Sequence, residues 1–141
     1  MASICAWVLA QLAKTLIAFL RGEGLQFHYL LGSGGMPSAH SAFVTALATS
    51  VAMLHGVGSV TFAISAILAL VVMYDAAGVR QSVSRQSIIL NRIVKELAIG
   101  RRVTELESDL RELIGHTQFQ VFVGAALGAT VAWLWITLIS V

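Results

Sequence analysis

Two basic residues lie in or beside an apolar run near the N-terminus, where charge is costly. Lys14 and Arg21 are seven residues apart, which is about two turns of an α-helix. Side chains with this spacing share one face of a helix, so we expect both cations to point the same way. Arg80 ends a later apolar run and supplies a third cation. Such a group of cations would neutralise an anion such as a phosphoryl group.

A glycine-led segment, Gly34-Gly35-Met36-Pro37-Ser38-Ala39-His40, opens the second apolar run. Glycine permits close approach of the backbone, and Pro37 suits the first turn of a helix. Amides at such a helix start form an anion site. His40 in this segment and His116 at the start of the last apolar run are candidates for an acid and a nucleophile, since histidine titrates near pH 7.

Each of these residues also has an ordinary structural interpretation. Lys14 alone could reach the membrane interface, and Arg21 could be a topology charge. His40 and His116 could be a helix residue and an interfacial residue without chemistry. Asp75, inside the third apolar run, could pair with a neighbouring cation, because an isolated charge there is expensive. Taken together, the cations, the helix start and the histidines favour a phosphate site.

The composition indicates an integral membrane protein. Of the 141 residues, 57% are hydrophobic and only 11% are charged, whereas soluble domains carry about 25% charged residues. The mean hydropathy is +0.85. We expect a single all-α domain over residues 1–141, a bundle of membrane helices. Cys5 stands alone and has no internal disulfide partner, so it is interpreted as a packing residue.

Four apolar segments approach the length of about 20 residues that a helix needs to cross a bilayer. The third and fourth are separated by a charged segment, 80–115, whose stretch 88–99 has apolar residues at helical spacing and is expected to lie along the interface. The predicted spanning helices are 3–20, 38–54, 59–79 and 117–139.

The basic residues predict the orientation. With four spans, segments 21–37 and 80–115 share one side, and all nine Lys and Arg residues lie on or toward it. By the positive-inside rule that side is cytoplasmic. Both termini would then be external, and the candidate site would open to the cytoplasm across a bacterial-type inner membrane or a plasma membrane.

The order of these motifs resembles the three-part signature of the phosphatidic acid phosphatase type 2 superfamily, which includes vanadium haloperoxidases. The similarity is closest to its divergent membrane branch. It rests on the pair Lys14-x6-Arg21 and on the segments Gly35-Met36-Pro37-Ser38-Ala39-His40-Ser41-Ala42, Tyr74-Asp75-Ala76-Ala77-Gly78-Val79-Arg80, Leu90-Asn91 and Glu112-Leu113-Ile114-Gly115-His116.

This resemblance implies a hydrolase of lipid phosphates that works without a metal or other cofactor, through a phosphohistidine. It implies that His116 attacks phosphorus and that His40 protonates the leaving oxygen. The phosphoryl oxygens would be held by Lys14, Arg21, Ser38 and Arg80, with Asp75, Gly35 and Asn91 in supporting positions.

One departure from the family pattern leaves an alternative open. Members usually have a carboxylate four residues after the nucleophilic histidine, and this chain has Gln120 there. A relative that binds phosphate without efficient turnover is therefore the second hypothesis. A small transporter is disfavoured, because no internal repeat is evident. Expected partners are a lipid phosphate substrate and membrane lipids, with no nucleic acid. Four short spans bury little surface, which is compatible with a homodimer.

Overall fold

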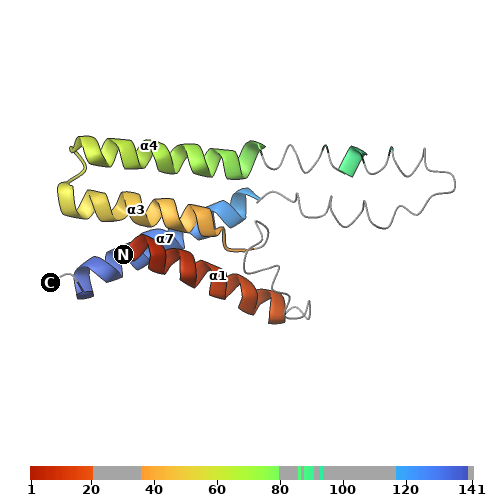
Figure 1. Cartoon of the computed structure of the whole chain (residues 1–141), viewed down its shortest axis with the longest axis horizontal. Coiled ribbons are helices and arrows are strands. Elements are labelled where there is room, and N and C mark those ends of the chain that lie inside the picture. Colours follow the sequence, from red (N-terminus) through yellow and green to blue (C-terminus); the bar gives the residue numbers. More distant parts are fainter. Residues whose placement is uncertain (21–35, 80–85, 87, 91–92, 94–116, 140–141) are drawn as a thin grey trace.

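The regular structure of the described residues is helical throughout. Figure 1 shows a computed structural model of the chain, which describes residues 1–20, 36–79, 86, 88–90, 93 and 117–139. Its elements are α1 (Ala2–Leu20), α3 (Ala39–His55), α4 (Val60–Tyr74), the π-helical turn η1 (Asp75–Val79) and α7 (Gln118–Ile139). The prediction of an all-α membrane bundle is confirmed. The proposed interfacial stretch 88–99 lies mostly outside the described residues.

Within the described part of the chain, three segments are long and apolar enough to cross a membrane: Ala2–Leu20, Val60–Gly78 and Gln118–Ile139. The second predicted span, 38–54, corresponds to α3, which has 17 residues. Its length is set by its caps. The side chain of Ser38 caps the N-terminus, and Gly56 ends the helix with a φ of 81°, a conformation that glycine adopts without a steric cost. The sequence had suggested that Pro37 lies in the first turn of the helix, but in the structure it precedes the N-cap residue Ser38.

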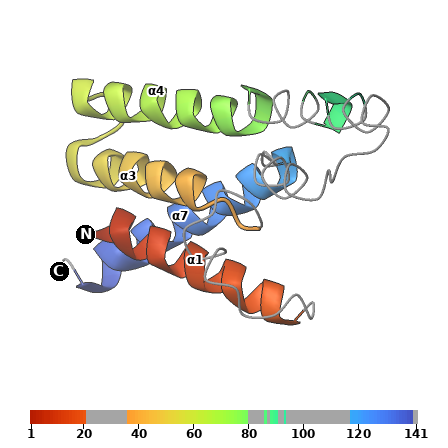
Figure 2. The ribbon, with the colours of Figure 1, turned by 45° about the vertical axis from the view of Figure 1, so that its right-hand side comes forward.

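Helix α3 is the centre of the bundle. It contacts α1, α4 and α7, and its contact with α7 is the most extensive (Figure 2). The chain runs alternately up and down, so the N-terminus, the C-terminal end of α7 and the turn between α3 and α4 lie at one end (Figure 1). The end of α1 and the starts of α3 and α7 lie at the other end, together with η1. This second end is where the sequence collects its candidate site residues.

The bundle buries small side chains and exposes large apolar ones. On α1, Ala2, Ala6 and Ala10 are buried, whereas Leu12 and Leu16 on the same helix are 56% and 58% exposed. Tight contact between small residues with an apolar exterior is typical of helices packed in lipid, where burial of large apolar groups gives no advantage over contact with lipid tails. The exposed apolar surface is therefore consistent with a membrane-embedded chain.

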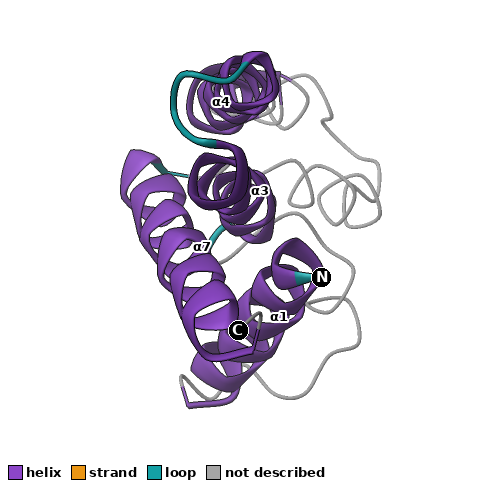
Figure 3. Cartoon of the chain, turned by 90° about the vertical axis from the view of Figure 1, so that its left-hand side faces the viewer, coloured by secondary structure: helices purple, strands orange, loops and turns teal. Residues whose placement is uncertain are grey.

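Two glycines allow the close contact between α3 and α7. Gly124 and Gly128 are one helical turn apart on α7. A Cβ atom at Gly124 would overlap the carbonyl oxygen of Ser38, the N-cap of α3, and one at Gly128 would overlap the carbonyl oxygen of Ala42. The helices therefore meet backbone to backbone, the geometry for which the small-xxx-small pattern is suited. Figure 3, a view along the bundle, shows α7 crossing beside α3.

We predict that Gly124→Ala and Gly128→Ala will each lower the free energy of unfolding by about 1–3 kcal/mol, the usual cost of overpacking. The reason is that the added methyl group can be accommodated only if the two helices separate. Thermal unfolding in detergent micelles would measure the loss. Gly78→Ala is the matched control, because nothing lies within 4 Å of a Cβ atom placed there. Equal unfolding midpoints for the three variants would contradict the close contact.

Candidate functional site

Lys14 is buried inside the bundle. It follows Ala2, Ala6 and Ala10 at intervals of four residues on the buried face of α1, and its side chain is only 3% exposed. The alanines pack against Ala39, Ala42 and Ala46 of α3. Because α1 and α3 run in opposite directions, the turn after Ala10 carries Lys14 toward the N-terminus of α3 (Figure 1). The structure thus places this cation inside the bundle rather than on its lipid-facing side.

Ser38 is the structural centre of the second predicted motif. It is fully buried, and its Oγ accepts hydrogen bonds from the backbone N–H of Ser41 at 3.4 Å and from the Ser41 hydroxyl at 3.0 Å. The cap satisfies one of the amides at the start of α3 and fixes the direction in which the chain enters the helix. A hydroxyl that accepts can also donate its hydrogen, so capping is compatible with the predicted contact to phosphate.

The main chain at Ser38 joins this motif to the start of α7. The Ser38 N–H donates to the carbonyl oxygen of Gln120 at 3.1 Å, one turn before the contact with Gly124. Two segments that are 82 positions apart (120 − 38) therefore meet at the backbone level. The contact therefore brings the Pro-Ser-x-His segment next to the first turn of α7, which begins two residues after His116 in the sequence.

Gln120 has a second partner in the first turn of its own helix. Its Oε1 accepts from the Thr117 backbone N–H at 3.0 Å, and the Gln120 N–H donates to Thr117 Oγ1 at 3.4 Å. This reciprocal pair is a capping box. The sequence analysis considered Gln120 only as the residue in place of the family's carboxylate and overlooked this role, although the pattern Thr-x-x-Gln before an apolar run was visible. Gly124 and Gly128 were overlooked in the same way, despite their spacing.

The remaining site predictions divide between described and undescribed positions. His40 is exposed in the first turn of α3, and Asp75 is half-buried at the point where α4 becomes π-helical. Single π-helical turns are frequent at functional sites. The structure thus brings Ser38 and Gln120 into contact and carries Lys14, His40 and Asp75 toward the same end of the bundle. The other predicted site residues lie outside the described residues: Arg21, Gly35, Arg80, Asn91 and His116.

Two features of this end attract an anion. Lys14 supplies a positive charge inside the bundle, and the N-termini of α3 and α7 both point their partial positive charge to the same end (Figure 1). Within the residues that the structure describes, no group of three or more His, Cys, Asp or Glu side chains is placed to hold a metal ion. A buried cation near helix starts can bind a phosphate or a similar oxyanion.

A helical membrane bundle with a Pro-Ser-x-His helix start beside its last helix defines a protein of the phosphatidic acid phosphatase type 2 kind. The chain belongs to the Divergent PAP2 family, whose profile matches residues 1–131. It is 38% identical over 139 aligned positions to the uncharacterized membrane protein YuiD of Bacillus subtilis (strain 168), an alignment that covers 91% of this chain and 87% of that protein. No solved structure matches the chain.

We predict that Thr117→Ala will destabilise the first turn of α7, because it removes the hydroxyl that accepts from Gln120. Loss of an N-cap side chain costs about 1 kcal/mol. Hydrogen–deuterium exchange of the amides at 118–121 should therefore become faster, by roughly fivefold for that free energy. Thr117→Ser retains the hydroxyl, so in this variant the amides at 118–121 should exchange at the wild-type rate. Unchanged exchange in Thr117→Ala would mean that the capping box does not hold this helix start.

Proposed function

We propose that this protein is a membrane phosphatase that removes a phosphoryl group from a lipid. The contact between Ser38 and Gln120 is the observation that supports the proposal most directly, because it joins the Pro-Ser-x-His helix start to the first turn of the helix that follows His116. Membership of the Divergent PAP2 family supports the same class of chemistry. The apolar exterior of the bundle supports a substrate that is itself a lipid.

In the proposed reaction His116 attacks phosphorus, and the bond from phosphorus to the lipid oxygen breaks as the histidine–phosphorus bond forms. His40 donates a proton to the departing oxygen. Water then attacks the phosphohistidine and releases inorganic phosphate. Lys14, Arg21 and Arg80 neutralise the charge on the phosphoryl oxygens, and the helix-start amides with Ser38 add hydrogen bonds. Positioning and charge neutralisation of this kind are the main requirements of phosphoryl transfer.

The second candidate function is phosphate binding with little turnover, and Gln120 favours it. An amide can accept a hydrogen bond from a neighbouring histidine, but it does not carry the negative charge that would stabilise a developing imidazolium. In serine proteases, loss of the carboxylate behind the catalytic histidine costs about 10⁴ in turnover. In this chain the Gln120 side chain also takes part in the capping box with Thr117. Such a protein would act as a sensor or regulator of lipid phosphates.

Phosphate release by the purified protein in detergent tests the proposal. The substrates would be phosphatidic acid, phosphatidylglycerol phosphate and polyprenyl phosphates and pyrophosphates, which share the anion and differ in the tail. We expect slow release from at least one substrate, unchanged by a chelator, because the proposed groups are cations and histidines. Release that disappears with chelator and returns with magnesium would contradict the histidine mechanism.

The variant Gln120→Glu distinguishes the two candidate functions. Glutamate also forms capping boxes, and a negative charge is favourable at a helix N-terminus, so the variant should fold as the wild type does. We predict that turnover will rise by roughly 10² or more, because a carboxylate would orient His116 and stabilise its positive charge. Gln120→Met, which abolishes the amide, is the control. If Gln120→Glu unfolds at the wild-type midpoint and turnover does not rise, the pairing of residues 116 and 120 is wrong.

We also propose that the site opens to the cytoplasm and that both termini are external. The support is the concentration of basic residues in segments 21–37 and 80–115. In a Cys5→Ala background, an impermeant thiol reagent added to intact cells should label a cysteine appended at the C-terminus. The same reagent should leave Arg101→Cys unlabelled until the cells are opened. The reverse pattern of labelling would invert the orientation.

A further inference from the structure

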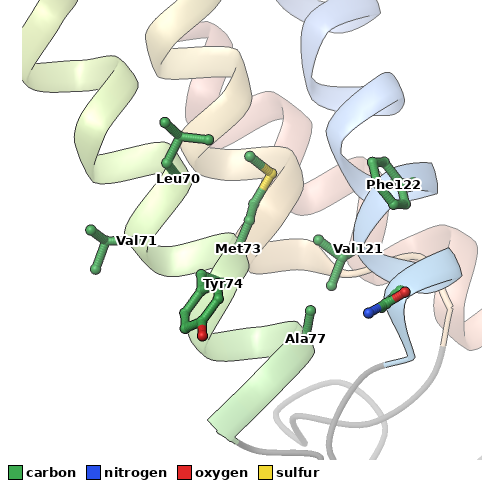
Figure 4. Close-up of a pocket in the computed structure, with 8 residues that line it drawn as sticks. Leu70, Val71, Met73, Tyr74, Ala77, Val121 and Phe122 are labelled. Atoms are coloured by element: carbon green, nitrogen blue, oxygen red, sulfur yellow. The ribbon is translucent and has the colours of Figure 1, made fainter.

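A groove of about 610 Å³ lies between the end of α4 with η1 and the start of α7. Its lining is apolar apart from the Tyr74 hydroxyl and the Gln118 amide. Met73 and Ala77 lie on one side and Val121 and Phe122 on the other, with Leu70 and Tyr74 along α4 (Figure 4). Its volume is within the range of about 300–1,000 Å³ that is typical of small-molecule sites.

The packing of the helices explains why a groove forms there. Helix α3 lies between α4 and α7 and contacts both, and α7 meets the other side of the groove through η1. The side chains deep in the groove are fixed. Val121 is 5% exposed, and the sulfur of Met73 accepts a hydrogen bond from Thr45 of α3 at 3.8 Å. The rims are open, since Tyr74 is 77% and Phe122 is 71% exposed. The groove thus has a buried, well-packed apolar base, and it opens sideways toward the bilayer.

Both walls of the groove continue directly into the candidate site. On the α4 side, Tyr74 is followed by Asp75, and Ala77 lies within the π-helical turn that precedes Arg80. On the α7 side, Val121 follows Gln120, whose carbonyl oxygen accepts from the Ser38 N–H. A molecule that fills the groove therefore has one end beside the helix starts that favour an anion and the other end in apolar surroundings.

From this continuity we infer that the groove holds one hydrocarbon chain of the lipid phosphate while its phosphate occupies the site. The inference rests on the proposed function, and it names the part of the protein that distinguishes long-chain lipids from soluble phosphate esters. It also assigns the route of entry, which is sideways from the bilayer between α4 and α7. A hydrocarbon chain in the groove would exchange its contacts with bulk lipid for contacts with Met73 and Val121 at the base. The affinity for the lipid would therefore depend on the length of its hydrocarbon chain.

A second apolar groove provides an internal control. It has a volume of about 430 Å³ and lies between the N-terminal half of α1 and the C-terminal half of α7, where Cys5, Trp135 and Leu138 are among its lining residues. This end of the bundle is the one opposite the candidate site (Figure 1). Bulk lipid should enter both grooves without regard to its head group, whereas a substrate chain should prefer the groove beside the site.

The experiment uses two photoreactive lipids with the same acyl chains, each with a diazirine at the end of one chain. One lipid is a phosphatidic acid and the other is a phosphatidylcholine. After irradiation of the full-length protein in vesicles, mass spectrometry would locate the cross-links. We expect phosphatidic acid to label peptides containing 70–77 and 118–122 several times more than phosphatidylcholine does. The two lipids should label the second groove equally.

Two matched variants test the groove itself, each placing a leucine where a small residue lines a groove. Ala77→Leu should lower labelling and affinity for long-chain phosphatidic acid by roughly fourfold for each methylene group that it displaces. A short-chain dibutyryl analogue should bind as before. Cys5→Leu, in the second groove, should change neither. If Ala77→Leu does not fold, Phe122→Ala, which removes an exposed rim residue, should produce the same selective loss for long chains.

The outcomes separate this inference from the proposed function. Phosphate release with equal labelling by both lipids would overturn the inference and leave the function standing, since the groove would then hold only bulk lipid. Preferential labelling by phosphatidic acid without phosphate release from any substrate would support the groove and contradict the enzyme. Equal labelling and no release would overturn both.

Discussion

The backbone contact between α3 and α7 is the constraint on which the rest of the structure depends. Gly124 and Gly128 permit it, because any larger residue would overlap a carbonyl oxygen of α3. At its end, the N–H of Ser38 reaches the carbonyl oxygen of Gln120. A contact between main-chain atoms leaves little freedom for sliding, so the register of the two helices is fixed. The segment that begins α3 and the residues that begin α7 are therefore held together independently of any bound anion.

The same central helix organises the other two. The alanines on one face of α1 pack on the alanines of α3 and bring Lys14, next along that face, into the interior. On its other side, α3 contacts α4 and thereby separates α4 from α7. Helix α3 thus accounts for both the buried cation and the apolar groove. Its close packing with α1 places Lys14 in the interior, and its position between α4 and α7 leaves the groove between those two helices.

Gln120 shows how one residue can serve the fold and the proposed chemistry at once. Its carbonyl oxygen accepts from the Ser38 N–H, and its side chain forms the capping box of α7 with Thr117. It also stands four residues after His116 in the sequence, where the family pattern has a carboxylate. The capping box needs an acceptor but not a charge, whereas stabilisation of an attacking histidine needs the charge. Glutamine therefore satisfies the capping box at position 120 as well as a carboxylate would, but it does not supply the charge that the proposed reaction requires.

The sequence by itself determined the class of the protein and the family, because apolar length, capping residues and short motifs are local properties. For the same reason it determined the bounds of α1, α3, α4 and α7 to within one residue, provided that the π-helical turn η1 is counted with α4. It also indicated that the polar residues collect at one end. It did not reveal that the face of α1 with the alanines and Lys14 is the buried one, or that the Ser38 N–H bonds to the carbonyl oxygen of Gln120. Only the tertiary structure decided these points, because each depends on which helix faces meet and in which register, and a single helix carries no information about its neighbours.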